Sequence, residues 1–184
     1  MVRRLTELDQ IIQRSLRDFV DTITRDAWSG RREREAICLY VMAHLQHEVK
    51  HGSVLFDPLQ IAIEFPVRQI AVEKQTAISR RKGAKREVAK DLLIWRRPKM
   101  TTWTCDGRSH HIPLAILEWK SGRVSAFEDD VRWLEEYSTE HPGCTGYAVS
   151  LHRDKRGTFS VRVTRVARGR RQIDWFEHIG QHSP

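Results

Sequence analysis

The stretch LAILEWKSG, residues 114–122, places four apolar residues directly before Glu118, Trp119 and Lys120, and then breaks at Ser121-Gly122. An apolar run of this length, bounded by a turn signal, is typical of a buried β-strand. Because side chains alternate between the two faces of a strand, Glu118 and Lys120 are expected on one face and Trp119 on the other. The stretch therefore predicts a strand that is buried for most of its length and carries an acid and a base together at its accessible end.

The overall charge of the chain favours a polyanionic partner. Its 184 residues include 32 Lys plus Arg against 24 Asp plus Glu, which gives a formal net charge of +8 at pH 7. Of the basic residues 24 are Arg and 8 are Lys, and Arg presents a planar fork of donors that matches phosphate geometry. A GC-rich coding sequence would enrich Arg equally, so composition indicates a nucleic-acid partner without proving one.

Cysteine usage and hydropathy predict a cytoplasmic protein. Cys38, Cys105 and Cys144 form no closely spaced pair, which argues against a disulfide framework and a structural zinc site. The N-terminus lacks the continuous apolar segment of a signal peptide, and no stretch approaches the roughly 20 apolar residues that span a bilayer. No membrane association is expected.

Hydrophobic periodicity predicts an α/β (α+β) fold with a mixed sheet flanked by helices. Helical spacing covers about residues 4–25, residues 32–50 and residues 124–141, and strand-like runs lie at 60–67, 91–95, 112–120, 144–154 and 158–168. The polar segment between the second and third strands can turn at Asp106-Gly107, which makes these strands antiparallel neighbours. We expect one compact unit, divided into an N-terminal helical extension (1–30), a core (31–165) and a basic C-terminal tail (166–184).

A second carboxylate is expected near the end of the LAILEWKSG strand. Asp91 begins the apolar run DLLIW, and in an antiparallel pair it would lie where Glu118 ends the neighbouring strand. Two such carboxylates, completed by waters and a substrate phosphate, can hold Mg²⁺ or Mn²⁺. The metal would lower the pKa of a bound water, and Lys120 would orient that water or help to deprotonate it. Asp91, Glu118 and Lys120 could instead be a surface salt-bridge cluster, and the triplet alone is not specific, because Glu48-Val49-Lys50 repeats it.

These residues resemble the PD-(D/E)xK nuclease superfamily, which has the restriction-endonuclease-like fold. The resemblance rests on KDLLIW with Asp91 and on LAILEWKSG with Glu118 and Lys120, and it covers about residues 31–152. It implies a metal-dependent nuclease in which Asp91 and Glu118 bind the metal and Lys120 assists the attacking water. Glu35, with Glu33 as second choice, matches a helical glutamate that supports the site in the family, and Glu64 matches a further acid on the first strand. Two departures are Lys90 in place of proline before Asp91, and Trp133 where one exonuclease subgroup has glutamine.

The segment SRRKGAKREVAK, residues 79–90, is a candidate nucleic-acid contact directly ahead of Asp91. In a nuclease, its basic side chains would neutralise backbone phosphates without reading sequence. A solvated loop would have the same composition. Trp103, in a polar hairpin, is a candidate for stacking on a base. The candidate phosphate-binding residues are Arg80, Arg81, Lys82, Lys85, Arg86 and Lys90.

Two alternative functions remain open at this level. A non-catalytic nucleic-acid-binding module on the same fold would need neither metal nor Lys120. HEVKH, residues 47–51, matches the zinc-peptidase pattern H-E-x-x-H, in which His47 and His51 bind zinc from one helical face and Glu48 acts as the base. Lys50 inside the motif and Gly52 directly after it argue against zinc, since a cation opposes metal binding and a helix end positions ligands poorly. Homodimerisation, with the first helix as one means of pairing, is a further hypothesis.

Overall fold

The computed structural model describes residues 5–30, 32–70, 87–121 and 125–181 of the chain. Its centre is a mixed sheet with the strand order β1-β2-β3-β4-β5-β6, in which β3 and β4 are parallel and every other neighbouring pair is antiparallel. The α/β (α+β) architecture predicted from periodicity is confirmed. The strands are β1 (Ile61–Arg68), β2 (Glu87–Ile94), β3 (Ala115–Ser121), β4 (Thr145–Arg153), β5 (Phe159–Ala167) and β6 (Arg170–Ile179).

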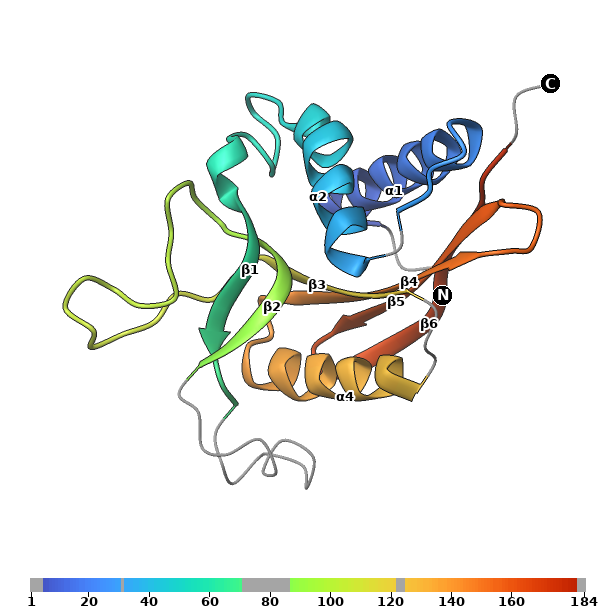
Figure 1. The fold of residues 1–184 in the computed structure, drawn as a ribbon. Helices are drawn as coiled ribbons and strands as arrows, with labels where there is room; N and C mark the ends of the chain where they lie inside the picture. The colour runs from blue at the N-terminus through green and yellow to red at the C-terminus, as the bar shows by residue number, and fades with distance from the viewer. Residues whose placement is uncertain (1–4, 31, 71–86, 122–124, 182–184) are drawn as a thin grey trace.

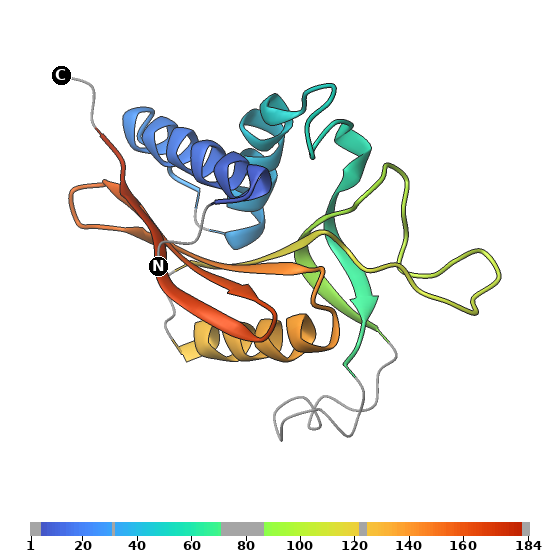
Figure 2. The ribbon, with the colours of Figure 1, turned by 180° about the vertical axis from the view of Figure 1, so that it is seen from behind.

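Helices cover both faces of this sheet (Figures 1 and 2). One face carries α1 (Glu7–Arg25) and α2 (Glu33–Ala43), and the other carries α4 (Ser125–Glu140), which connects the parallel strands β3 and β4. Two hydrophobic clusters result, one between the sheet and α1 and α2, the other between the sheet and α4. None of the helices in the described ranges is long and apolar enough to cross a membrane.

The first helix is part of the main core. Thr6 caps it, because its hydroxyl accepts from the Asp9 N–H and its own N–H donates to the Asp9 carboxylate. Leu16 and Phe19 are fully buried in the same cluster as Leu117 and Val149 of the sheet. The division that set residues 1–30 apart as an extension therefore does not describe how the helix packs.

The C-terminal segment is a strand, which corrects its prediction as a basic tail. Arg170–Ile179 forms β6 and pairs with β5 along almost its whole length. Both residues of the connecting turn, Arg168 and Gly169, have positive φ (53° and 68°), as a tight hairpin of matching twist requires. Arg-Gly is a weak turn signal, and Trp175 and Phe176, buried in the core, supply the apolar surface that fixes the strand.

The second helix is shorter than predicted. The α-helix ends at Ala43, His44 has φ −132°, and Leu45–Glu48 continues as a single 3₁₀ turn. Leu45 and Leu55 are fully buried on either side of the turn at Gly52. A straight helix to residue 50 would carry the following segment away from this core.

Candidate active site

The end of β3 separates its side chains as the sequence predicts. Trp119 is 1% exposed and packs against Phe19 and Tyr40 under α1 and α2, with ring centroids 5.9 and 5.2 Å away. Glu118 and Lys120 project to the opposite face, where they meet residues of β2 and α4. The apolar ring anchors the strand, and the two charged groups are presented together on the α4 side.

Asp91 lies where β2 leaves β3. The two strands pair from Ile94 to Leu92, and at the next position the Asp91 carboxylate, not the backbone, accepts the Trp119 N–H at 2.7 Å. On the other side of β2, pairing with β1 is interrupted at Glu64, whose φ is 49°. This irregularity lets the chain bend, because a residue in the left-handed region breaks the regular pleat. β2 and β3 diverge here, and the Asp91 side chain fills the resulting gap in the backbone hydrogen bonds between them.

Glu118 is a buried acid in contact with a buried base. Its side chain is 5% exposed and forms an ion pair with Lys90, whose ammonium also lies 3.5 Å from the centroid of the Trp133 ring. Burial raises the pKa of Glu118 to about 7, and the charges of Asp91 and Asp130 add to the rise, while Lys90 opposes it. Its environment therefore favours the anionic form of this carboxylate less than water does.

Lys120 is held as a cation by two acids. Its Nζ lies 3.0 Å from Asp130 Oδ2 and 3.7 Å from Glu33 Oε1, and it donates to the Trp119 carbonyl at 2.7 Å. Burial lowers the pKa of Lys120, but Asp130 and Glu33 outweigh this and raise it above its ordinary value. In this arrangement Lys120 supplies a positive charge and donates hydrogen bonds, and it does not act as a base.

Glu33, and not Glu35, is the helical glutamate beside Lys120. Glu33 accepts the Ser121 N–H at 3.2 Å at the end of β3. Burial raises its pKa, with Asp91 and Asp130 adding to the effect and Lys120 and the Ser121 N–H opposing it. The Glu35 carboxylate instead accepts the Arg32 N–H at the start of α2. Side chains two residues apart on a helix point in directions about 200° apart, so Glu33 and Glu35 lie on nearly opposite sides of α2. The choice between them therefore decides which side of α2 faces the site.

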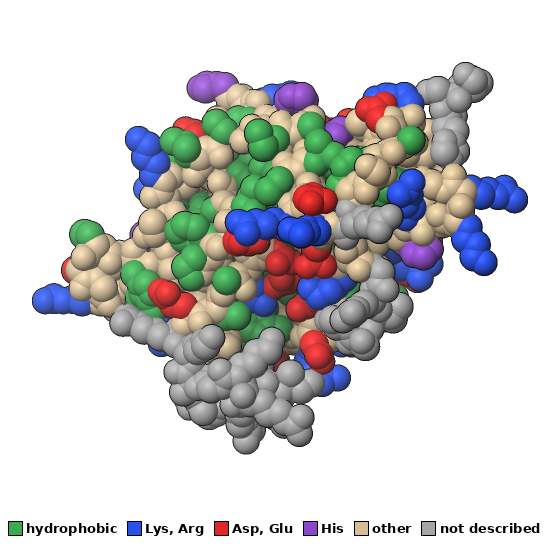
Figure 3. All heavy atoms as spheres, in the orientation of Figure 1, with side chains coloured by type: hydrophobic (Ala, Val, Ile, Leu, Met, Phe, Trp, Pro, Cys, Tyr) green, Lys and Arg blue, Asp and Glu red, His purple; other side chains and the backbone are tan. Residues whose placement is uncertain are grey.

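The site combines four carboxylates with two ammonium groups. Figure 3 shows acidic side chains gathered at the centre of one face, between α2 and α4, with basic side chains beside them. Glu118 Oε1 and Asp130 Oδ2 are buried, and within the described part of the chain neither has a correctly directed hydrogen-bond donor, although each contacts an ammonium group. Such oxygens are costly unless a cation or water completes them. The four acids are Glu33, Asp91, Glu118 and Asp130.

These donors fit a hard divalent cation that keeps most of its water. Within the described residues, no group of three or more His, Cys, Asp and Glu side chains is arranged to hold a metal ion by itself. Mg²⁺ does not need one, since one or two carboxylates, waters and a substrate phosphate complete its octahedral shell. Asp91 and Glu118 supply two carboxylates on neighbouring strands, and a bound cation would have to displace Lys90 from Glu118.

The basic segment ahead of Asp91 lies largely outside the described residues. This applies to Arg80, Arg81, Lys82, Lys85 and Arg86. Lys90 is described, and its prediction as an exposed phosphate contact is wrong in placement, because β2 begins at Glu87 and turns the 6%-exposed Lys90 inward onto Glu118. Trp103 donates its indole N–H to Glu87 and packs against His110.

The H-E-x-x-H motif does not lie on an α-helix. His47 and Glu48 belong to the 3₁₀ turn, His51 follows it, and Glu48 pairs with Arg14 at 2.7 Å. The motif depends on α-helical spacing to bring its histidines together. A tighter turn does not provide that spacing, and within the described residues no group of three or more His, Cys, Asp and Glu side chains that could hold a metal ion is found here.

Asp130 and Trp133 belong to the site but were not identified as site residues from the sequence. Asp130 lies one residue before Val131, on a helix that was predicted from its apolar stripe alone. Trp133 was noted only as a departure from a subgroup pattern, yet its ring lies under Lys90. The position of Asp130 four residues before Leu134, on the side of α4 that faces the sheet, was the usable clue.

No family model, curated protein or solved structure matches this chain. The relation to PD-(D/E)xK nucleases expected from the sequence therefore rests on the sequence motifs alone. The fold is defined here by its own topology, a six-stranded mixed sheet flanked by helices.

Proposed function

We propose that this protein is a metal-dependent nuclease of the PD-(D/E)xK type, with a restriction-endonuclease-like core, that hydrolyses phosphodiester bonds in DNA. The observation that carries the proposal is the convergence of Asp91, Glu118 and Lys120 at one strand end, inside a surplus of carboxylates. The acids come from adjacent antiparallel strands, and the lysine follows the second acid by two residues. The net charge of +8 supports a polyanionic substrate.

Asp91 and Glu118 would hold Mg²⁺ or Mn²⁺. When bound, the ion supplies polarisation of a water and neutralisation of the charge that builds on the phosphate. The buried and incompletely satisfied Glu118 oxygen supports this role, because it is the kind of acceptor that a cation completes. Lys90 would release Glu118 as the ion binds and keep its charge near the entering phosphate.

Lys120 would act through its charge. Asp130 and Glu33 keep it protonated, so it would hold the attacking water or the phosphate by hydrogen bonds and stabilise negative charge in the transition state. Glu33 would take the supporting role assigned to Glu35 from the sequence, since it contacts both Lys120 and the end of β3.

The test is cleavage of plasmid and of short single-stranded DNA in Mg²⁺, Mn²⁺ or EDTA. Wild type should cut only with a divalent ion, and Lys120→Ala and Asp91→Ala should lose cutting while still binding DNA. Lys50→Ala is the matched control, because it lies in the second acid-x-Lys triplet and should cut as wild type does. Cutting that survives in EDTA or in Lys120→Ala would refute the proposed mechanism.

A non-catalytic nucleic-acid-binding module is the second candidate. The ion pair between Lys90 and Glu118 favours it, because an internal cation can neutralise the acid permanently. Calorimetric titration with Mn²⁺ separates the two functions. A binder on this fold would take up no ion at Asp91 and Glu118, and its DNA affinity would be unchanged in Lys120→Ala.

A further inference from the structure

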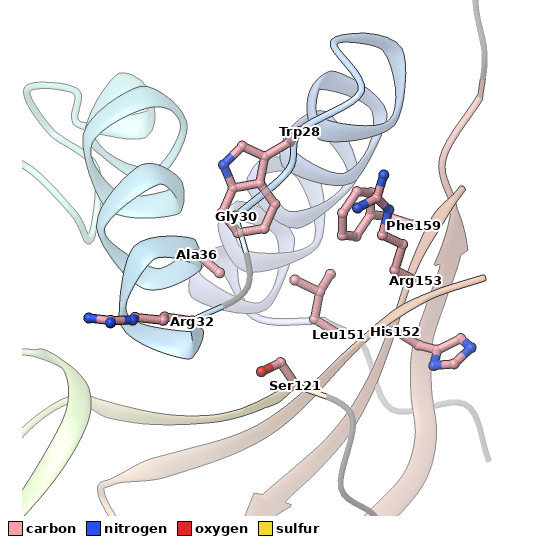
Figure 4. Close-up of a pocket in the computed structure, with 9 residues that line it drawn as sticks. All are labelled: Trp28, Gly30, Arg32, Ala36, Ser121, Leu151, His152, Arg153 and Phe159. Atoms are coloured by element: carbon pink, nitrogen blue, oxygen red, sulfur yellow. The ribbon is translucent and has the colours of Figure 1, made fainter. Parts of the chain in front are cut away.

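A second cavity lies directly beside the candidate active site. It has a volume of about 420 Å³ and opens between the α1–α2 connection and the ends of β3, β4 and β5 (Figure 4). The Trp28, Leu151 and Phe159 side chains point toward one another around it. A volume near the lower end of the roughly 300–1,000 Å³ typical of ligand pockets suits one planar ring system, not a double helix.

Two aromatic rings and a guanidinium define the chemistry of this cavity. The Trp28 and Phe159 ring centroids are 5.7 Å apart, and Arg153 Cζ lies 5.3 Å from the Phe159 centroid. Trp28 is only partly buried. Its indole covers Gly30, where any side chain would collide with the ring. The arrangement offers a stacking surface with a cation at its edge, which fits a base and its phosphate better than a purely apolar ligand.

Arg153 has no acidic partner within the described ranges, unlike several other arginines of the chain. Examples of arginines that form an ion pair with a carboxylate, at 3.1 Å or less, are Arg14, Arg165 and Arg171. Arg32 is also exposed without an ion pair among those residues, and it extends from the start of α2 away from the cavity (Figure 4). Both guanidinium groups are therefore available to phosphate oxygens.

The cavity and the candidate active site are joined through the backbone. Ser121 lines the cavity and directly follows Lys120, while Arg32 lines it and directly precedes Glu33. The Ser121 N–H donates to Glu33, which ties the two pairs together. The cavity therefore adjoins the backbone that carries Lys120 and Glu33.

We propose that this cavity receives an unpaired base of the nucleic acid, stacked on Trp28, with the adjoining phosphate on Arg153. The inference builds on the proposed function and names its substrate class: DNA that is single-stranded, flapped or branched beside the cut. A base in a continuous duplex is already stacked and paired, and extruding it costs a few kcal/mol. Continuous duplex is therefore the poorer ligand.

The test measures binding in EDTA, where cleavage cannot interfere. The probes are a short single-stranded oligonucleotide carrying 2-aminopurine, the same oligonucleotide with one abasic position, and its duplex. Wild type should prefer the single strand to the duplex by about tenfold or more and should quench the 2-aminopurine by stacking. Removing the base should cost about tenfold, since base stacking on an aromatic residue contributes about 1–3 kcal/mol.

Variants separate the cavity from general charge. Trp28→Leu should abolish quenching and weaken the single strand about tenfold, with folding checked by thermal denaturation. Arg153→Gln should weaken the single strand and leave duplex binding unchanged, whereas Arg156→Gln, in the turn that follows Arg153 and not among the residues lining the cavity, should change neither. Equal affinity for both forms, or no effect of Trp28→Leu and Arg153→Gln, would overturn the inference even if plasmid is cut. Strong single-strand binding with no cleavage would instead refute the nuclease and support the cavity.

Discussion

Among the residues that the structure describes, two clusters of buried charge are built in opposite ways. Asp9 of α1 is 2% exposed, and its carboxylate accepts from Arg165 Nε at 2.6 Å, from the Tyr147 hydroxyl at 2.8 Å and from the Thr6 N–H at 2.9 Å. Glu118 is nearly as buried, yet its Oε1 contacts Lys90 without a correctly directed donor and lies in the field of Asp91 and Asp130.

The pKa values of the two acids report this difference. Burial raises the pKa of Asp9, but hydrogen bonds from Arg165, Thr6 and Tyr147 outweigh it and lower the pKa below its ordinary value. Burial, together with the charges of Asp91 and Asp130 and against the opposing effect of Lys90, raises the pKa of Glu118 to about 7. A saturated acid stabilises the fold, whereas a crowded and unsaturated one retains capacity for a ligand. The comparison separates a structural ion pair from a candidate site.

The largest effect is expected from Asp91→Asn. The amide oxygen can still accept the Trp119 N–H, so the melting temperature should stay within a few degrees of wild type. The charge needed to hold a metal is lost, which should slow single-turnover DNA cleavage by about three orders of magnitude, or about 4 kcal/mol. A variant that cuts at the wild-type rate would show that Asp91 is only a backbone cap.

Asp9→Asn should lower the stability of the fold and leave DNA cleavage unchanged. It removes one partner of a buried pair, which costs about 3 kcal/mol of unfolding free energy. Urea denaturation measures that loss, and cleavage per folded molecule should be unchanged. Asp26→Asn, which breaks the exposed pair with Arg25, is the matched control and should cost about 0.5 kcal/mol or less. A similar small loss in Asp9→Asn would remove the distinction between the clusters.

Lys90→Met should tighten divalent-ion binding about tenfold, or about 1.4 kcal/mol. The thioether can still pack on Trp133, while the ammonium that competes for Glu118 is removed. Mn²⁺ titration checks this, with the exposed Lys99→Met as control. Unchanged affinity in both variants would mean that Glu118 does not exchange Lys90 for metal.

The smallest effect is expected in the dependence of stability on pH under acidic conditions. Because the folded pKa of Asp9 is lowered, its stabilising contribution is complete above the unfolded value of about 4 and is lost as the pH falls through the lower, folded value. The stability difference between wild type and Asp9→Asn, measured by urea unfolding at several pH values, should be constant near neutrality and shrink below about pH 4. A difference that grows on acidification would contradict the assignment.

Sequence reasoning located the elements of this fold better than their ends. The period-2 pattern of residues 144–168 predicted the β4–β5 hairpin, and the apolar stripe with Val131, Leu134 and Tyr137 predicted α4, because each pattern is set by a face that must be buried. β6 was missed because its turn uses Arg168-Gly169, and because most of its residues are exposed on the sheet edge. Its pairing partner is a tertiary property.

Some residues of the candidate site were likewise found from local sequence patterns, and others only from the structure. Asp91, Glu118 and Lys120 were identified because Asp91 directly precedes the apolar run LLIW and the other two follow the apolar run LAIL, although β2 itself begins earlier, at Glu87. Lys90 was assigned to a basic loop because it ends a run of basic residues directly ahead of Asp91, whereas β2 begins at Glu87 and brings Lys90 against Glu118. Glu35 was chosen over Glu33 because the rotation of α2 over the sheet has no signature in a single chain.

The sequence by itself determined that one strand would end with an acid and a base on the same face, because alternation along a strand is fixed by backbone geometry alone. It also determined the helices and most strands through the apolar faces they must bury. Only the tertiary structure decided which charges meet. Glu33 and Asp130 reach Lys120 from two helices on opposite faces of the sheet, and Trp28 meets Phe159 across distant segments, since such contacts depend on how elements pack and not on any local pattern.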